Sequence, residues 1–137
     1  GYAKVFSMLK TGGVFACFDN HPFEDKGRPE LADDIQRLYA RYMGSACRPK
    51  EYDIEAARRK AAVALRYGFR DIACELFHRQ RRLSAEEYVA LLGTYSDHIA
   101  LEAGLRSEFY RRIEDAIDRH GGEITIYDTI DLRLAIK

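Results

Sequence analysis

Two hydrophobic periodicities alternate along the chain, and this alternation restricts the fold more than any other feature. In some stretches apolar residues recur every three or four positions, which is typical of a helix with one buried face. In other stretches they form a continuous run or occupy every second position, as they do in strands. In sequence order the pattern predicts helix, strand, two helices, strand, two helices and strand. This order predicts the α/β fold class, with about three mixed strands and flanking helices.

The first predicted strand is a continuous apolar run, Val14–Phe18. It follows a helix predicted over Tyr2–Leu9, which Gly12-Gly13 ends because glycine readily adopts the left-handed conformation at a helix C-terminus. An uninterrupted apolar run is typical of a strand that is covered on both faces, so it predicts an interior, parallel strand. The polar residues and the proline of Asp19–Pro22 are predicted to end the strand pairing.

Helical spacing then predicts two helices within a segment of about 23–68. The first, Leu31–Met43, is amphipathic, and Gly44 follows its end as the capping rules favour. The second, from about Asp53 to Tyr67, has a narrow face of small residues that would bury little apolar area. We therefore expect this second helix to be a mobile cover rather than part of the core.

The remaining segment, 69–137, predicts strand, helix, helix and strand. The strand is centred on Ile72–Phe77, and Ser84 with Glu87 then predicts a capping box at the start of the next helix. A further amphipathic helix ends at Gly121-Gly122.

The last predicted strand, Ile124–Ile136, has apolar residues at its even positions apart from Asp128. Its odd positions are mostly polar and include Thr129, Asp131 and Arg133. This alternation predicts a strand with one polar face, and therefore an antiparallel strand at the edge of the sheet.

The charge balance argues against a nucleic-acid binder, which would normally show a basic excess. Lys and Arg together number 22, as do Asp and Glu. The one basic run, 78–82, is predicted to be a solvated strand end rather than a phosphate site. No apolar run approaches the roughly 20 residues that a membrane helix needs, and no signal peptide pattern is present. We therefore expect neither a nucleic acid nor a membrane as partner.

The three cysteines, Cys17, Cys47 and Cys74, include no C-x-x-C pair, so they predict neither a disulfide framework nor a zinc site. Free thiols fit a reducing cytoplasm best. The four histidines are widely spaced and form no recognisable ligand motif, so no metal site is predicted.

Three segments of the chain share a pattern with one known family: Phe6–Phe15, Leu83–His98 and Ile117–Gly122. In this order they resemble class I S-adenosylmethionine-dependent methyltransferases, in particular small-molecule enzymes of the type 11 and trans-aconitate groups. The first is similar to the family's Leu-Lys-Pro-Gly-Gly turn and fifth strand, with Thr11 in place of the usual proline. The second resembles the Ser-x-x-x-Tyr-x-x-Leu-Leu-x-Thr-Tyr-Ser segment after the penultimate strand. The third leads into a strand similar to the family's antiparallel seventh.

The resemblance implies the C-terminal half of a methyltransferase domain, with a partial Rossmann-like fold. The helical segment of about 23–68 resembles the family's variable substrate cover. In this family a glycine-rich loop and an acidic residue at the end of the second strand bind the cofactor, and both would precede Gly1. The glycine pairs 12–13 and 121–122 lack the G-x-G-x-x-G spacing and follow helices, so neither is that loop. We therefore expect a substrate-side portion of a methyltransferase that acts on a small molecule. S-Adenosylmethionine would bind the intact domain, and this chain alone would be inactive.

Six side chains are candidates for lining a substrate pocket: Asn20, His21, Tyr39, Tyr42, Tyr95 and His98. Asn20 and His21 follow the first strand, where ligands bind in open α/β sheets, although polar residues can also simply end a strand. For Tyr39 and Tyr42, core packing is the favoured alternative because aromatic residues at helical spacing are usually core. His98 is a candidate base, but a hydrogen-bonded histidine at a helix end is more common. No residue is assigned as catalytic.

The alternative interpretation is a non-catalytic module that binds a ligand or another copy of itself. A sheet that is cut before its fifth strand leaves one edge of Val14–Phe18 unpaired, and such edges are pairing sites. Leaving Phe15 and Phe18 in water would forfeit about 2 kcal/mol each. We therefore expect a dimer, or exchange of elements with a partner chain.

Overall fold

The computed structural model describes residues 1–45, 48 and 50–137, so Cys47 lies outside the described residues. These residues divide into two compact units, which are described separately. Unit 1 comprises 1–22, 51–79 and 128–137, and unit 2 comprises 23–50 and 80–127. The segment 23–68, predicted as a cover, is therefore divided between the two units, and its role as a cover stays a prediction.

The helices and strands of the described residues follow the predicted order, except that a short helix, α5 (Ser96–Ile99), lies between the two helices predicted after the second strand. The strands are longer than predicted. The elements are α1 Tyr2–Met8, β1 Val14–Phe23, α2 Pro29–Met43, α3 Ile54–Ala62, the 3-10 helix η1 Val63–Tyr67, β2 Arg70–Ser84, α4 Ala85–Leu92, α5 Ser96–Ile99, α6 Ala103–Arg119 and β3 Glu123–Ile136. The capping box at Ser84 and Glu87 is confirmed, since each side chain accepts a backbone N–H of the other residue. None of the described helices is long and apolar enough to cross a membrane.

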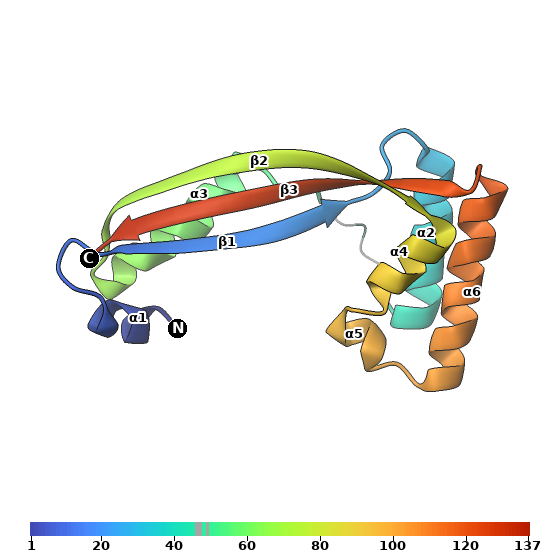
Figure 1. Ribbon diagram of the computed structural model, residues 1–137, viewed down its shortest axis with the longest axis horizontal. Coiled ribbons are helices and arrows are strands. Elements are labelled where there is room, and N and C mark those ends of the chain that lie inside the picture. Colours follow the sequence, from blue (N-terminus) through green and yellow to red (C-terminus); the bar gives the residue numbers. More distant parts are fainter. Residues whose placement is uncertain (46–47, 49) are drawn as a thin grey trace. The chain divides into compact units, whose positions relative to one another are not determined.

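One sheet contains all three described strands, in the order β1-β3-β2 (Figure 1). β3 runs antiparallel to both neighbours (Figure 1), and Lys137, the residue after it, exchanges backbone hydrogen bonds with Gly12 and Gly13 just before β1. The α/β class and the antiparallel last strand are thus confirmed.

The predicted places of two strands in the sheet are wrong. β1 was expected to be an interior, parallel strand, and it is an edge strand that pairs antiparallel with β3. β3 was expected at the edge, and it is central. Asp19–Pro22 does not end the pairing, because β1 continues to Phe23 and the polar side chains of this stretch meet polar partners on β3. The polar residues of 19–22 can therefore remain in the strand, because they form hydrogen bonds with β3.

The buried face of β3 changes along the strand, which the alternation did not predict. In unit 2 the even positions Ile124 and Ile126 are buried, whereas in unit 1 the odd positions Thr129 and Asp131 are buried. The expected solvent face of β3 is therefore an interior face in unit 1. The physical reason is that α3 and the residues before it lie against this face (Figure 1), as the contact of Tyr52 with Asp131 shows.

The small-residue face of α3 and η1, formed by Ala57, Ala61 and Ala64, is buried. Ala64 packs with Phe69 and Ala135 in the apolar core of unit 1. The expectation that this helix stands outside the core is therefore wrong, because small side chains allow close packing of a helix on a sheet. Mobility of the helix is not tested by this packing.

The larger apolar core lies in unit 2, where α2 and α4 each pack against α6 (Figure 1). Phe109, Ile113 and Ile117 of α6 are fully buried, and Leu31 of α2 and Leu92 of α4 pack in the same cluster. Their spacing is the helical apolar stripe that the sequence predicts.

Candidate functional site

The six predicted site residues lie in two groups, one in each unit. Asn20 and His21 lie on β1 in unit 1, and the other four lie together in unit 2. In unit 2 the rings of Tyr39 and Tyr42 both contact Phe109, and the rings of Tyr39 and Tyr95 both contact that of His98. The structure therefore brings these four residues together, although their role in binding stays a prediction.

The histidine of the unit 2 group is buried among aromatic rings. The side chain of His98 is 1% exposed, and its Nε2 lies 3.1 Å from the hydroxyl of Tyr39. Its Nδ1 has no hydrogen-bond partner among the described residues. Burial lowers the pKa of His98, so the neutral ring is favoured in the fold. Burial also raises the pKa of Tyr39, so the hydroxyl stays protonated.

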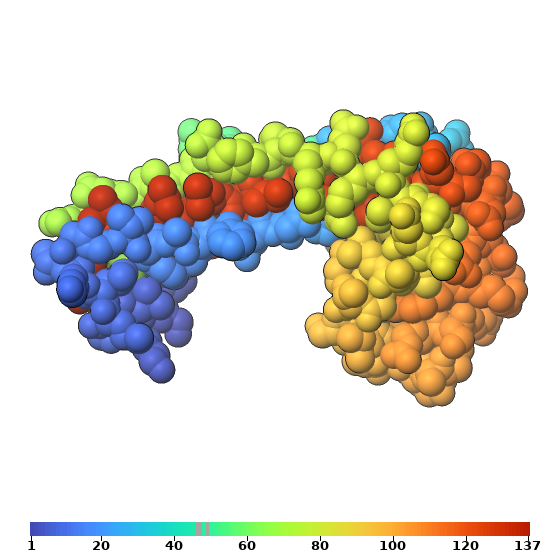
Figure 2. Space-filling view, in the orientation of Figure 1, coloured from blue at the N-terminus to red at the C-terminus, as the bar shows by residue number. Residues whose placement is uncertain are grey.

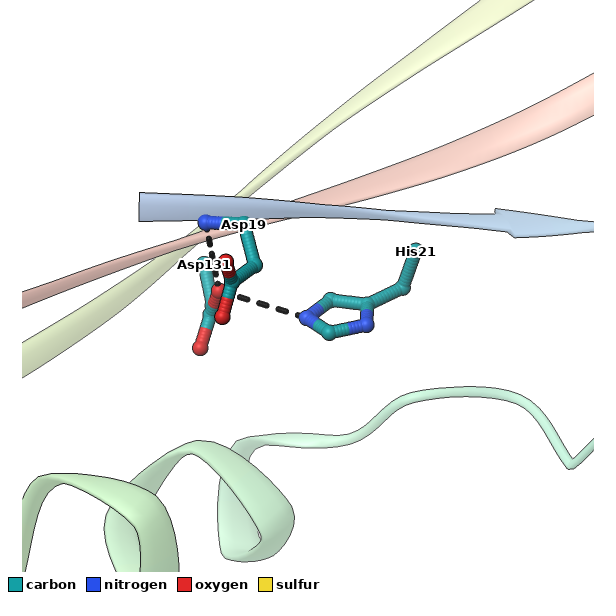
Figure 3. A group of neighbouring side chains, drawn as sticks. All are labelled: Asp19, His21 and Asp131. Atoms are coloured by element: carbon teal, nitrogen blue, oxygen red, sulfur yellow. Dashed lines mark hydrogen bonds and ion pairs between the residues drawn. The ribbon is translucent and has the colours of Figure 1, made fainter. Parts of the chain in front are cut away.

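In unit 1 a cluster of polar side chains surrounds Asp131 of β3, whose side chain is 0% exposed (Figure 3). Its Oδ1 accepts the backbone N–H of Asp19 at 3.0 Å and lies 3.2 Å from Nε2 of His21. Its Oδ2 accepts the hydroxyl of Tyr52 at 2.9 Å. Arg133 Nε lies 2.9 Å from Oδ2 but is not aligned for a hydrogen bond, so this contact is an ion pair. We call the set of Asp131, Asp19, His21, Tyr52, Arg133 and Lys60 the Asp131 cluster.

The antiparallel pairing of β1 with β3 explains why the cluster forms. Asp19 and His21 are two residues apart on β1, so their side chains point to the same face of the sheet. The contact of His21 with Asp131 places the Asp131 carboxylate on that face as well. Asp53 caps the N-terminus of α3 by accepting the N–H of Ala56, and this cap fixes where the chain before the helix lies. Tyr52 is thereby placed with its ring stacked on that of His21, at a centroid distance of 3.6 Å and an angle of 6°.

The electrostatics of the cluster keep Asp131 ionised. Burial alone would raise the pKa of Asp131, but hydrogen bonds from Tyr52 and His21 and the charge of Arg133 outweigh it and lower the pKa. Burial and the hydrogen bond to Asp131 raise the pKa of Tyr52 to about 12, so its hydroxyl remains a donor. The ionised carboxylate of Asp131 therefore accepts hydrogen bonds from three donors and fixes their directions. The donors are the backbone N–H of Asp19, the ring of His21 and the hydroxyl of Tyr52.

The Asp131 cluster has three potential metal ligands, Asp19, His21 and Asp131, whose ligand atoms all lie within 4.8 Å of one another. The two carboxylates are already matched by two cations. Arg133 pairs with both acids, and Lys60 Nζ lies 3.3 Å from Oδ2 of Asp19. A metal ion would face these two positive charges, so the charge distribution disfavours a cation here.

Asn20 takes part in a neighbouring polar contact on β3. Its Nδ2 donates to Oδ1 of Asp128 at 3.0 Å, and Nε of Arg79 donates to Oδ2 of the same buried carboxylate at 3.1 Å. Arg79 belongs to the basic run predicted as a solvated strand end, and its pairing with Asp128 agrees with a structural role for this residue.

Sequence reasoning missed Asp131 and Tyr52. Asp131 sits at an odd position of a strand whose odd face was expected to meet solvent, and Tyr52 precedes a helix that was expected to lie outside the core. One signal was available: an acidic residue followed two positions later by Arg133 places opposite charges on one strand face. That signal alone does not distinguish a buried pair from a solvated one.

Comparison with known proteins finds likenesses among solved structures but not among family models or curated sequences. No protein-family model matches the chain, and no curated protein sequence matches it. Among solved structures, the chain is similar to one from Anaeromyxobacter dehalogenans that is provisionally described as a type II methyltransferase. The TM-score is 0.60 at 19% identity, over 98% of this chain and 57% of that one. At this identity the likeness shows the fold alone, and the chain spans little more than half the length of this structural neighbour.

S-Adenosylmethionine, the cofactor that the sequence resemblance implies, does not fit the described residues. A cofactor loop of this kind connects a strand to a helix and is rich in glycine. Ser84 ends β2 and caps α4 directly, and Gly27 is the only glycine between β1 and α2. Gly12 and Gly121-Gly122 adopt positive φ angles just after helices. The described connections from a strand to a helix therefore include no loop of this kind.

Proposed function

We propose that this chain is the C-terminal, substrate-side portion of an S-adenosylmethionine-dependent methyltransferase that acts on a small molecule. The observation that supports this proposal most is the structural likeness, which covers nearly all of this chain but 57% of the neighbour. The poor fit of the cofactor to the described residues agrees with it. On this proposal the chain is inactive alone, and the remainder of the domain supplies the cofactor site.

The experiment compares two proteins by calorimetric titration with S-adenosylmethionine. The first is this 137-residue chain, for which no binding is expected because it contains no suitable loop. The second is the polypeptide obtained by adding the sequence encoded immediately before Gly1, for which stoichiometric binding is expected. Stoichiometric binding by the short chain, or an unrelated domain upstream, would contradict the proposal.

A second candidate function, self-association, is supported by an uncovered apolar sheet face in unit 1. Phe18, Val14 and Phe77 are 74%, 55% and 47% exposed. Figure 2 shows atoms of β1, β3 and β2 side by side at the surface in this region, with no helix across them. The outer edge of β1 is also unpaired among the described strands. Exposed apolar faces and free edges are association sites.

Self-association is tested by light scattering over a range of concentrations. We expect the mass of the wild-type chain to rise from that of a monomer toward that of a dimer. The variant Phe18→Lys should stay monomeric because a charge on this face would have to be buried on association. Lys4→Ala, a change at an exposed position of α1, is the control and should behave as the wild type. A wild-type chain that remains monomeric at the highest concentration would contradict self-association.

A further inference from the structure

We infer that His21 presents its Nδ1 as a hydrogen-bond and proton acceptor to a neutral small molecule that carries an O–H or N–H group. Asp131 is the positioning residue that aims the ring. The inference rests on the proposed function only where it names such a molecule as the substrate class. The site itself is argued from the geometry of unit 1.

The protonation pattern of the ring follows from its partner. An ionised carboxylate can only accept hydrogen bonds, and Oδ1 of Asp131 lies 3.2 Å from Nε2 of His21. The neutral ring therefore carries its proton on Nε2, which leaves a lone pair on Nδ1. Figure 3 shows Nδ1 on the side of the ring away from both carboxylates. No described residue forms a hydrogen bond with Nδ1.

The ring is held in one orientation by contacts on its edge and its face. The hydrogen bond to Asp131 fixes the Nε2 edge, and the stacked ring of Tyr52 covers one face. Tyr52 is itself anchored by its hydroxyl on the same carboxylate. His21 nevertheless remains accessible, because its side chain is 22% exposed while that of Asp131 is 0% exposed. Nδ1 of His21 therefore points in a defined direction, on a side chain that is partly exposed.

The charges around His21 select the class of ligand. The other polar groups of the Asp131 cluster are the carboxylates of Asp19 and Asp131, the cations of Arg133 and Lys60, and the neutral hydroxyl of Tyr52. The formal charges of the two acids and the two bases cancel. A balanced cluster requires no ionic ligand, and a neutral molecule enters it with the smallest desolvation cost.

The chemistry at the nitrogen is a single proton transfer. The ligand's O–H or N–H donates to Nδ1, the proton moves to this nitrogen, and the electron pair of the broken bond stays on the ligand's oxygen or nitrogen. The ring then carries a positive charge, which the adjacent carboxylate of Asp131 stabilises. The ligand atom that has lost its proton is a stronger nucleophile, which is what a methyl acceptor requires.

The test uses phenol and its methyl ether anisole as matched probes on the complete 137-residue chain. The two molecules have similar shape, but anisole has no O–H to donate. Ring nitrogens of the 15N-labelled chain are followed by long-range proton–nitrogen correlation. We expect wild-type His21 to show the Nε2–H tautomer, and phenol to move its Nδ1 signal saturably at millimolar concentration while anisole does not. The signals of buried His98 serve as the internal control.

Asp131→Asn tests the positioning role. An amide can donate as well as accept, so we expect a mixture of tautomers at His21 and an affinity for phenol that falls about fivefold or more. Tyr52→Phe keeps the contact between His21 and Asp131 and should retain the tautomer and the preference for phenol over anisole. If Asp131→Asn does not fold, as judged by circular dichroism, the wild-type tautomer and the two probes decide the question.

Two results would overturn the inference: a wild-type His21 that carries its proton on Nδ1, or equal shifts with phenol and anisole. These outcomes are independent of the calorimetric test of the methyltransferase proposal. If the upstream-extended protein fails to bind S-adenosylmethionine but the phenol preference holds, the site remains and only its role in methyl transfer is lost.

Discussion

Phe109→Ala is expected to lower the free energy of unfolding of unit 2 by about 4 kcal/mol. Phe109 is 0% exposed, and its ring contacts those of Tyr39, Tyr42 and His98 at centroid distances of 5.2 to 5.6 Å. Removing it leaves a cavity surrounded by large rings, which cannot collapse far without leaving their own contacts. Urea unfolding followed by near-ultraviolet circular dichroism measures the loss, because the tyrosines around the cavity report on unit 2.

The matched control is Leu105→Ala, one turn earlier on the same helix. Leu105 is 40% exposed, so truncating it removes little buried area and should cost less than about 1 kcal/mol. Similar losses for the two variants would show that the ring of Phe109 does not fill the core of unit 2. A large loss for Phe109→Ala would agree with the core-packing interpretation of Tyr39 and Tyr42.

The helices and the core of unit 2 could be predicted from the sequence, because the pattern there is local. Leu31–Met43 and the stripe around Phe109 repeat at helical spacing, and the Ser84 capping box consists of residues three positions apart. Each signal lies within a few residues, so no knowledge of distant partners is needed. The same reasoning explains why the start of α3 and the bounds of α2 were nearly correct, whereas the short helix α5 was not predicted.

Strand neighbours could not be predicted in the same way, because they depend on pairing between distant segments. Val14–Phe18 is apolar at every position, which suggested cover on both faces, yet Phe18 is 74% exposed and the strand lies at an edge. An apolar run shows that a face can be buried, and it does not show that a partner is present in the same chain.

Only part of the Asp131 cluster could be predicted from the sequence. His21 was among the predicted site residues, but its partners lie 31 and 110 positions further along the chain, at Tyr52 and Asp131. Two-residue periodicity shows that Asp131 and Arg133 share one face of β3 without showing which face a helix covers. In unit 1, α3 covers the polar face of β3, so polar side chains are buried there. A buried polar face of this kind often marks a functional site rather than a stabilising core.

Removing the central carboxylate with Asp131→Ala is expected to lower the free energy of unfolding at pH 7 by about 3 kcal/mol. The change leaves the backbone N–H of Asp19, His21 and the hydroxyl of Tyr52 without their acceptor, and Arg133 loses its buried partner. The loss lies at the lower end of the range for broken buried pairs, because Arg133 keeps its ion pair with Asp19. Urea unfolding of the wild type and the variant measures it.

The same pair of proteins gives a pH dependence with a definite sign. The pKa of Asp131 is lower in the fold than its ordinary value, so the carboxylate stabilises the fold at pH values above the unfolded pKa of about 3.9. This contribution is lost as the pH falls through the lower, folded pKa. The difference in unfolding free energy between wild type and Asp131→Ala should therefore be full at pH 7 and shrink below about pH 4.

Asp19→Ala is the control that separates burial from charge. Asp19 pairs with the same Arg133, but its side chain is 49% exposed, so its removal should cost less than about 1 kcal/mol. A loss for Asp19→Ala as large as that for Asp131→Ala would mean that the ion pair, rather than the buried set of hydrogen bonds, stabilises the cluster. The larger loss for Asp131→Ala would show that this carboxylate holds Tyr52 and His21 in place, which is the arrangement that a directed nitrogen on His21 requires.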